Sequence, residues 1–123
     1  MHSFECEAER VGSAAVVSVQ GELDIYTAER FRKVLRKVAA WRVGRRLVID
    51  LTECSFLDST ALGVLVAEKQ RFGEAPLNIA AHVGALRVLT ISGFDKILQI
   101  HRTREEALAA LEPPAALDPG DAD

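Results

Sequence analysis

Cysteine and long hydrophobic runs are scarce in this sequence. Its 123 residues include two cysteines, Cys6 and Cys54, which lie far apart and lack the paired spacing of a zinc site. We expect both to be reduced, half-buried thiols, and a redox bridge between them is the minor alternative. No stretch approaches the ~20 apolar residues of a membrane span, and residues 1–10 lack the apolar core of a signal peptide. The sequence therefore predicts a cytoplasmic protein with no metal site and no contact with a membrane.

An excess of charge of one sign is also absent. Lys and Arg number 15 against 18 Asp and Glu, which gives a formal net charge of -3 and predicts no general affinity for nucleic acid. The basic run at residues 30–37 has acidic neighbours and no interleaved aromatic platform, which favours a solvated helix face over a nucleic acid patch. With 49% hydrophobic and 27% charged residues, the composition is that of an ordinary globular domain. We expect its partners to be proteins or small molecules.

Two hydrophobic periods alternate along the chain. A period of two residues predicts strands, the first two of which form a hairpin through the turn signal at residues 11–13. The predicted strands cover residues 3–9, 14–20, 46–51, 76–80 and 97–101. Four helices are predicted. The first begins at the N-cap Thr27, the second and third cover residues 59–71 and 83–91, and the fourth follows the capping box at residues 103–106. In the helix of residues 59–71, which Gly73 ends, the spacing places Leu62, Leu65 and Val66 inward and Glu68, Lys69 and Arg71 outward.

This order of elements predicts the fold class and the domain organisation. We expect an α/β fold with a mixed, mostly parallel central sheet of about five strands, an edge hairpin and about four helices. Residues 1–112 form one domain, and residues 113–123, rich in Pro, acidic and small residues, form a disordered tail. Binding surfaces of such sheets gather at the carboxyl ends of strands. Two polar segments, GELD at residues 21–24 and DST at residues 58–60, follow strands in this way.

The DST segment places two hydroxyls and a carboxylate at the start of a helix. Hydroxyl side chains are good N-caps, so Ser59 and Thr60 have an architectural explanation. A hydroxyl in this place is also a site where an added phosphate meets free helix amides and the positive end of the helix dipole. A catalytic serine is not indicated, because the chain has no Gly-x-Ser-x-Gly elbow and no motif joins its histidines to Ser59. We therefore expect no catalytic residue.

Three segments, taken together, resemble one known family. GELDIYTAE at residues 21–29, VIDLTECSFLDSTALGVLV at residues 48–66 and LTISGFDKILQI at residues 89–100 occur in the order and spacing of the STAS-domain family. Within that family they are similar to bacterial anti-sigma factor antagonists. The resemblance covers residues 3–111. One departure is Ala61, where many antagonists have glycine; alanine favours helix and restricts the backbone beside Ser59.

The resemblance implies a partner-switching cycle. The unphosphorylated antagonist binds an anti-sigma factor that is also a serine kinase, and a sigma factor is thereby released. The kinase then phosphorylates the serine after the motif's Asp, here Ser59, and a metal-dependent serine phosphatase reverses the step. On this reading ATP and magnesium belong to the kinase, and this chain is neither an enzyme nor the holder of a cofactor. The alternative is a STAS scaffold or accessory subunit, of a stress-sensing complex or a lipid transporter, that is never phosphorylated.

The resemblance also implies which residues meet the partner. The expected partner-binding residues are Glu22, Asp24, Asp58, Thr60, Leu62 and Gly63. Two of them have architectural alternatives of equal weight, because Asp58 can cap a helix and Asp24 can serve as a turn carboxylate that caps the helix beginning near Thr27. Thr60 is expected to be a second hydroxyl at the helix start with no phosphate of its own.

Overall fold

A five-stranded sheet forms the centre of the computed structural model, which describes residues 3–73, 76–91, 93 and 97–111. The strands are β1 (Glu5–Val11), β2 (Ala14–Leu23), β3 (Leu47–Leu57), β4 (Leu77–Ala81) and β5 (Leu98–His101), adjacent in chain order. β1 pairs antiparallel with β2, and every later pair is parallel. The mixed, mostly parallel sheet with an edge hairpin is therefore confirmed. The predicted tail lies outside the described residues.

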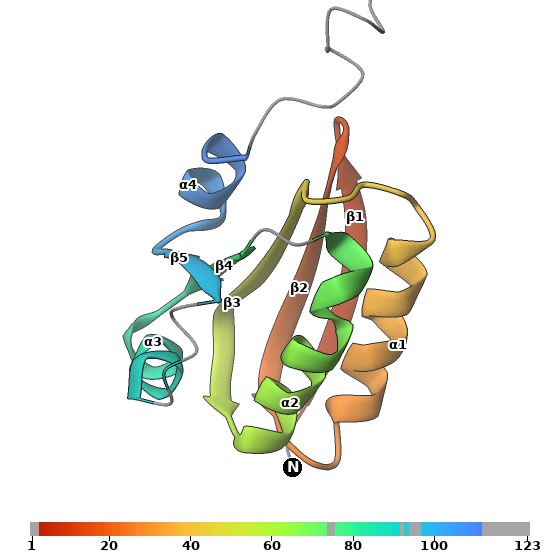
Figure 1. Cartoon of the computed structure of the whole chain (residues 1–123). Helices are drawn as coiled ribbons and strands as arrows, with labels where there is room; N and C mark the ends of the chain where they lie inside the picture. Colours follow the sequence, from red (N-terminus) through yellow and green to blue (C-terminus); the bar gives the residue numbers. More distant parts are fainter. Residues whose placement is uncertain (1–2, 74–75, 92, 94–96, 112–123) are drawn as a thin grey trace, which may run out of the picture.

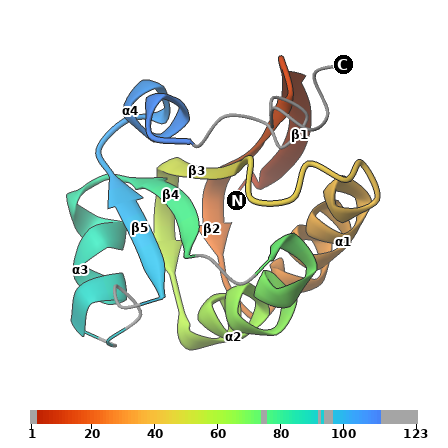
Figure 2. The ribbon, with the colours of Figure 1, turned by 45° about the horizontal axis from the view of Figure 1, so that its top comes forward.

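Helices cover the two faces of the sheet unequally. The helices are α1 (Ala28–Ala39), α2 (Ser59–Glu68), α3 (Val83–Ile91) and α4 (Arg104–Ala109), and a 3-10 turn, η1 (Lys69–Phe72), follows α2. α1, α2 and α3 lie on one face, where Phe31, Leu65 and Leu89 pack on Val17 and Ile49 (Figures 1 and 2). Of the described helices, the short α4 alone lies on the other face, over a second, smaller core. That core consists of Val16, Val48, Ala80 and Ala107, with Leu108 and Leu111 packed against it.

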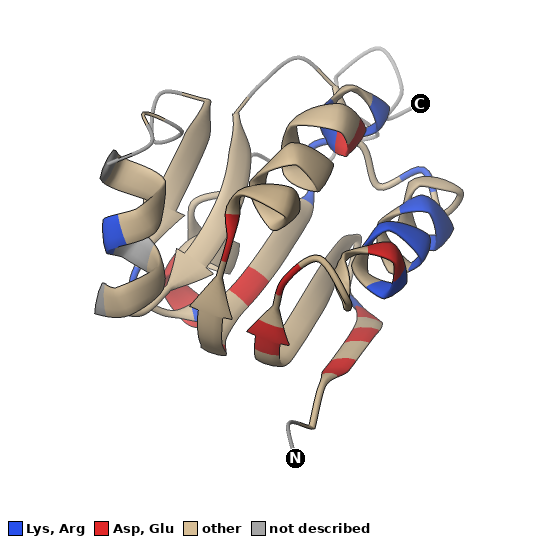
Figure 3. Ribbon diagram, turned by 90° about the horizontal axis from the view of Figure 1, so that it is seen from below, with Lys and Arg blue, Asp and Glu red and all other residues tan. Residues whose placement is uncertain are grey.

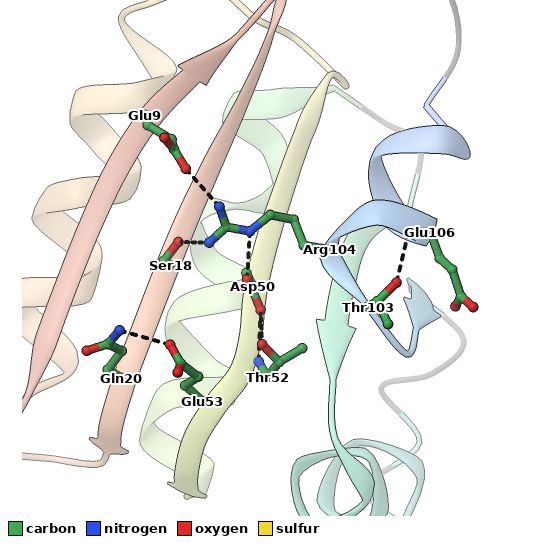
Figure 4. Close-up of polar contacts among 9 residues, drawn as sticks. All are labelled: Glu9, Ser18, Gln20, Asp50, Thr52, Glu53, Thr103, Arg104 and Glu106. Atoms are coloured by element: carbon green, nitrogen blue, oxygen red, sulfur yellow. Dashed lines mark hydrogen bonds and ion pairs between the residues drawn. The ribbon is translucent and has the colours of Figure 1, made fainter.

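One arginine fastens α4 across three strands. The Arg104 guanidinium donates to Asp50 Oδ2 at 2.9 Å on β3, Ser18 Oγ at 2.6 Å on β2 and Glu9 Oε1 at 2.8 Å on β1 (Figure 4). Burial alone would raise the pKa of the Asp50 carboxyl, but hydrogen bonds from Thr52 and Arg104 hold that pKa below its ordinary value. One half of the predicted capping box is confirmed, because the Glu106 N–H donates to Thr103 Oγ1 at 3.0 Å; the Glu106 carboxylate accepts from the Arg102 N–H at 3.2 Å, one residue before the N-cap. The last helix therefore joins the first strand through an ionic contact.

The predicted ends of two strands were wrong. Residues 21–23 extend β2 and residues 52–57 extend β3, and the two extensions pair with each other as far as Leu23 and Leu57. The pairing register shifts between Ser18 and Gln20 and again between Gly21 and Glu22, so the simple alternation breaks while the pairing continues. Through this irregular pairing, the two strands stay paired almost to the start of α2.

The inward face predicted for the second helix was partly wrong. Leu62 and Leu65 are buried as expected, but Val66 is 44% exposed and Glu68 is only 2% exposed. The Glu68 carboxylate lies between α1 and α2, where it accepts hydrogen bonds from Arg36 and Arg71. Burial opposes the charged form of Glu68, but these two bonds hold its pKa below the ordinary value. A buried carboxylate between two helices is therefore stabilised by a neighbour on its own side, Arg71, and by Arg36 on another helix, which the local period does not show.

Candidate functional site

Asp58 is the N-cap of α2 and Ser59 is its first helical residue. The Asp58 backbone is extended, and its Oδ1 accepts a hydrogen bond from the Ala61 N–H at 3.1 Å. The capping role of Asp58 is therefore confirmed, and the Ser59 hydroxyl is not the cap. Ser59 is exposed, whereas Ala61 is fully buried with its small side chain in the core. Alanine at this position thus suits a helix whose first turn packs directly on the sheet.

The loop between β2 and α1 is held by its own polar side chains. Asp24 Oδ1 accepts hydrogen bonds from the backbone N–H groups of Tyr26 at 2.9 Å and Thr27 at 3.2 Å. The Thr27 hydroxyl donates to the Glu22 carbonyl oxygen at 2.8 Å and accepts from the Asp24 N–H at 2.9 Å. The turn role of Asp24 is confirmed. Thr27 occupies the N-cap position of α1, but its hydroxyl braces the loop and does not cap the helix.

The carboxyl ends of β2 and β3 bring the two segments together. Leu23 pairs with Leu57, and the Asp58 N–H donates to the Leu23 carbonyl oxygen at 3.2 Å. The residues on either side of this contact, Glu22 and Asp24 in one segment and Ser59 in the other, lie at the same end of the sheet. Figure 3 shows this end, with acidic residues on β2, in the following loop and at the start of α2, and basic residues gathered on α1. A phosphate on Ser59 would therefore join an acidic edge.

The expected partner-binding residues differ in how much surface they offer. Glu22, Asp24, Asp58 and Thr60 are half-buried, and Gly63 is exposed on α2, one turn beyond Ser59. Leu62 is 4% exposed and packs in the core, so in the free protein it offers almost no surface to a partner. The edge around Ser59 thus consists of loop carboxylates and the outer side of α2.

Sequence reasoning missed three exposed apolar residues at this edge. Ile25 is 66% exposed, Tyr26 is 89% exposed and Phe56 is 51% exposed. Ile25 and Tyr26 lie in the loop after β2, and Phe56 lies near the end of β3. A signal was available in the sequence, because Ile25 and Tyr26 fall between a turn and a helix, where neither period gives them a place in the core.

Two histidines contact nearby oxygen atoms of the protein, and the two cysteines are free thiols. His82 Nε2 lies 2.6 Å from the Cys54 carbonyl oxygen, and His101 Nε2 lies 3.1 Å from Asn78 Oδ1. Cys6 and Cys54 are free, and burial raises the pKa of the Cys6 thiol to about 12 and also raises that of Cys54. Within the described ranges, no group of three or more His, Cys, Asp or Glu residues could hold a metal ion.

In the part of the chain that the structure describes, no helix has the length and apolar character needed to cross a membrane.

Comparisons with known proteins agree with this geometry. The chain is 36% identical over 94 residues to the "Anti-sigma-B factor antagonist" of Listeria monocytogenes, covering 73% of this chain and 81% of the relative. It is 29% identical over 117 residues to the "Anti-sigma F factor antagonist" of Paenibacillus polymyxa, covering 89% of this chain and 97% of the relative. A crystal structure of an anti-sigma factor antagonist from Mycobacterium paratuberculosis superposes with a TM-score of 0.76 at 30% identity, covering 88% of this chain and 93% of that one. The STAS domain matches residues 5–107, and the chain therefore belongs to the STAS-domain family.

Proposed function

We propose that this chain is an anti-sigma factor antagonist whose binding is switched by phosphorylation of Ser59. The unphosphorylated form binds an anti-sigma factor that is also a serine kinase, and this binding frees a sigma factor. The kinase supplies ATP and magnesium, and a metal-dependent serine phosphatase removes the phosphate. In this proposal the chain is a substrate and a binding module and not an enzyme. Its similarity to proteins named as antagonists supports the partner, and the geometry of Ser59 supports the switch.

The observation that carries the proposal is the exposed Ser59 at the first position of a capped helix. Because the Asp58 side chain serves as the cap, modification of the Ser59 hydroxyl breaks no cap bond. The first amides of a helix lack intrahelical partners, and together with the helix dipole they favour an added phosphate by ~0.3 to 1 kcal/mol. The fold can therefore accept the modification, and its effect falls on the surface.

The energy of the switch comes from charge at an interface. Phosphorylation adds about -1.5 to -2 charges beside the carboxylates of Glu22, Asp24 and Asp58. Like charges brought together across an interface, or a dianion stripped of water against an apolar surface, cost several kcal/mol. A penalty of ~4 kcal/mol weakens binding about a thousandfold. Local electrostatics is thus sufficient to release the partner without a change of fold.

The partner surface in this proposal comprises Ser59, Gly63, Glu22 at the end of β2 and Asp24 in the following loop, with Asp58 and Thr60 beside them. Leu62 belongs to the proposal only as a core residue that holds α2 in place, because it is almost fully buried. Thr60 is half-buried behind Ser59, and we expect no phosphate on it.

A phosphorylation experiment tests the proposal. The purified chain is incubated with purified anti-sigma factor kinases and ATP, and the added mass is located by peptide mapping. We expect one phosphate, on Ser59, with none on Ser55, an exposed serine four residues earlier that serves as an internal control. Ser59→Ala should keep its affinity for the kinase, and Ser59→Asp should lose it.

The opposite outcome identifies the alternative function. If Ser59 stays unmodified beside an active kinase, and Ser59→Asp binds as tightly as the natural chain, the switch proposal fails. The chain would then be a STAS scaffold or accessory subunit that works without phosphorylation.

A further inference from the structure

Exposed apolar side chains are concentrated at the end of the sheet beside Ser59. The large hydrophobic residues more than a third exposed, in the described part of the chain, are Val11, Ile25, Tyr26, Phe56 and Val66. Ile25, Tyr26 and Phe56 follow or end β2 and β3, and Val66 lies on the outer side of α2. Val11 lies apart from them, at the β1–β2 turn at the opposite end of the sheet (Figure 1). Three apolar residues at one end form what we call the edge patch: Ile25, Tyr26 and Phe56.

The backbone of the edge patch is fixed before any partner binds. Asp24 Oδ1 accepts the Tyr26 N–H, and the Thr27 hydroxyl donates to the Glu22 carbonyl oxygen and accepts from the Asp24 N–H. Phe56 is held by the β3 ladder opposite Glu22. Burying a side chain on a fixed backbone costs less conformational entropy than ordering a mobile loop, so such residues gain more affinity per unit of buried area.

Tyr26 has the properties of an interface anchor. At 89% exposure it contributes almost nothing to the core, so the fold does not explain why a large aromatic stands there. Tyrosine buries a wide apolar ring at the cost of two side-chain torsions and is enriched among residues that dominate binding energies. Its position between Asp24 and Thr27 puts it in the loop after β2, at the same end of the sheet as Ser59.

Charge around the edge patch specifies the complementary surface. Carboxylates of Glu22, Asp24 and Asp58 flank it, and basic residues are gathered on the neighbouring helix α1 (Figure 3). A protein that covers the patch must offer an apolar pocket with Lys or Arg at its rim. A kinase that reaches the Ser59 hydroxyl has to approach this same end of the sheet, because Ser59 follows Leu57 and Asp58 directly.

We infer that Tyr26, with Ile25 and Phe56, is the apolar anchor by which this chain holds its kinase, Tyr26 entering an apolar pocket rimmed by basic side chains. The inference rests on the proposed function and assigns binding affinity and switching to different residues of the same surface. The edge patch supplies affinity, and Ser59 supplies the switch. Affinity can therefore be removed without adding any charge.

The test compares Tyr26→Ser with Val11→Ser, a matched loss of an exposed apolar side chain far from Ser59. The probe is a purified anti-sigma factor kinase that binds the natural chain, and binding is measured by calorimetry. We expect Tyr26→Ser to bind about 30-fold more weakly or worse and Val11→Ser to bind as the natural chain does. Phosphorylation of Ser59 in Tyr26→Ser should show a raised KM with an unchanged kcat. Thermal unfolding should be unchanged, because the Tyr26 backbone bond to Asp24 survives the substitution.

Further outcomes separate this inference from the proposed function. If Tyr26→Ser and Phe56→Ser both bind the kinase normally and Ser59 is still phosphorylated, the inference is overturned while the proposed function stands. If the natural chain self-associates through the patch, Tyr26→Ser is monomeric and kinase binding is equal in both, a second copy is the occupant and the inference is again overturned. Failure of the proposed function appears elsewhere, as an unmodified Ser59 and a Ser59→Asp variant that binds normally.

Discussion

Asp58 and Ser59 divide two tasks between neighbouring residues. Asp58 closes the start of α2 with its carboxylate, and Ser59 stands outside that bond with its hydroxyl exposed. If Ser59 were itself the cap, a phosphate would remove a structural hydrogen bond. Because the cap and the proposed phosphorylation site are different residues, Ser59 can be modified while Asp58 still caps α2. The sequence predicted a cap in this segment but left the carboxylate and the hydroxyls as alternatives, and the structure assigns the cap to Asp58.

The capping role predicts the behaviour of Asp58 variants. Asp58→Ala should lower the free energy of unfolding by about 1 kcal/mol, because the Ala61 N–H loses its acceptor. Asp58→Asn keeps an acceptor oxygen in the same place and should be close to the natural chain. Urea unfolding followed by circular dichroism measures both. Equal stability of Asp58→Ala and the natural chain would contradict the assignment of the cap.

At the scale of whole elements, the helices divide the sheet into a well-covered face and a sparsely covered one. α1 to α3 cover the first. Among the described residues the second carries just the short α4, held by Ala107, Leu108 and Leu111 and by the Arg104 contacts. Hydrogen bonds to charged groups contribute about 1.5 to 3 kcal/mol each, and removal of Arg104 also leaves the nearly buried Asp50 carboxylate without that partner. The docking of α4 therefore depends on one side chain to an unusual degree.

Hydrogen exchange can test this dependence. In Arg104→Ala the amides of α4 should exchange faster than in the natural chain, while those of α1 and α2 keep their rates. Arg102→Ala is the control, since Arg102 is an exposed neighbour whose contact with Glu106 uses its backbone N–H. Unchanged exchange in α4 of Arg104→Ala would show that the apolar contacts of Ala107 hold the helix alone.

The elements also show where sequence reasoning stops. The hairpin, α1 and α3 were predictable, because a local hydrophobic period determines each of them. The buried Glu68 and the exposed Val66 were not, since the arginine that makes burial of Glu68 tolerable, Arg36, lies on another helix. The contacts of Arg104 join residues 54 to 95 positions apart, and no local pattern announces them. At the candidate site, the helix start and the family resemblance predicted Ser59. The place of Tyr26 between a turn and a helix was a signal in the sequence, but its 89% exposure is seen only in the fold.

At the scale of the whole molecule, the candidate site occupies one end of the sheet and the fold continues away from it. The carboxyl ends of β2 and β3 present the loop carboxylates, the edge patch and Ser59 together. α4 and the β1–β2 turn do not take part in this end. A modification at Ser59 therefore acts on one region of the surface.

Phosphorylation should accordingly leave the fold unchanged. In amide NMR spectra of the chain phosphorylated on Ser59, we expect shifts for residues of the β2–α1 loop and of the first turn of α2. The amides of α4 and of the β1–β2 turn should keep their positions. The free energy of unfolding should change by less than about 1 kcal/mol, because the helix dipole stabilises the phosphate while the neighbouring carboxylates repel it. Widespread shifts would indicate a conformational switch and contradict a purely local one.

The Arg104 contacts also affect the order in which the protein can mature on the ribosome. Chains are synthesised from the N-terminus, so the hairpin carrying Glu9 and Ser18 emerges long before Arg104 does. Until then, the Asp50 carboxylate has no Arg104 guanidinium to bind. Helix α4 is thus the element that neutralises the Glu9 and Asp50 carboxylates, and its ionic contacts form only after all five strands of the described sheet have been synthesised.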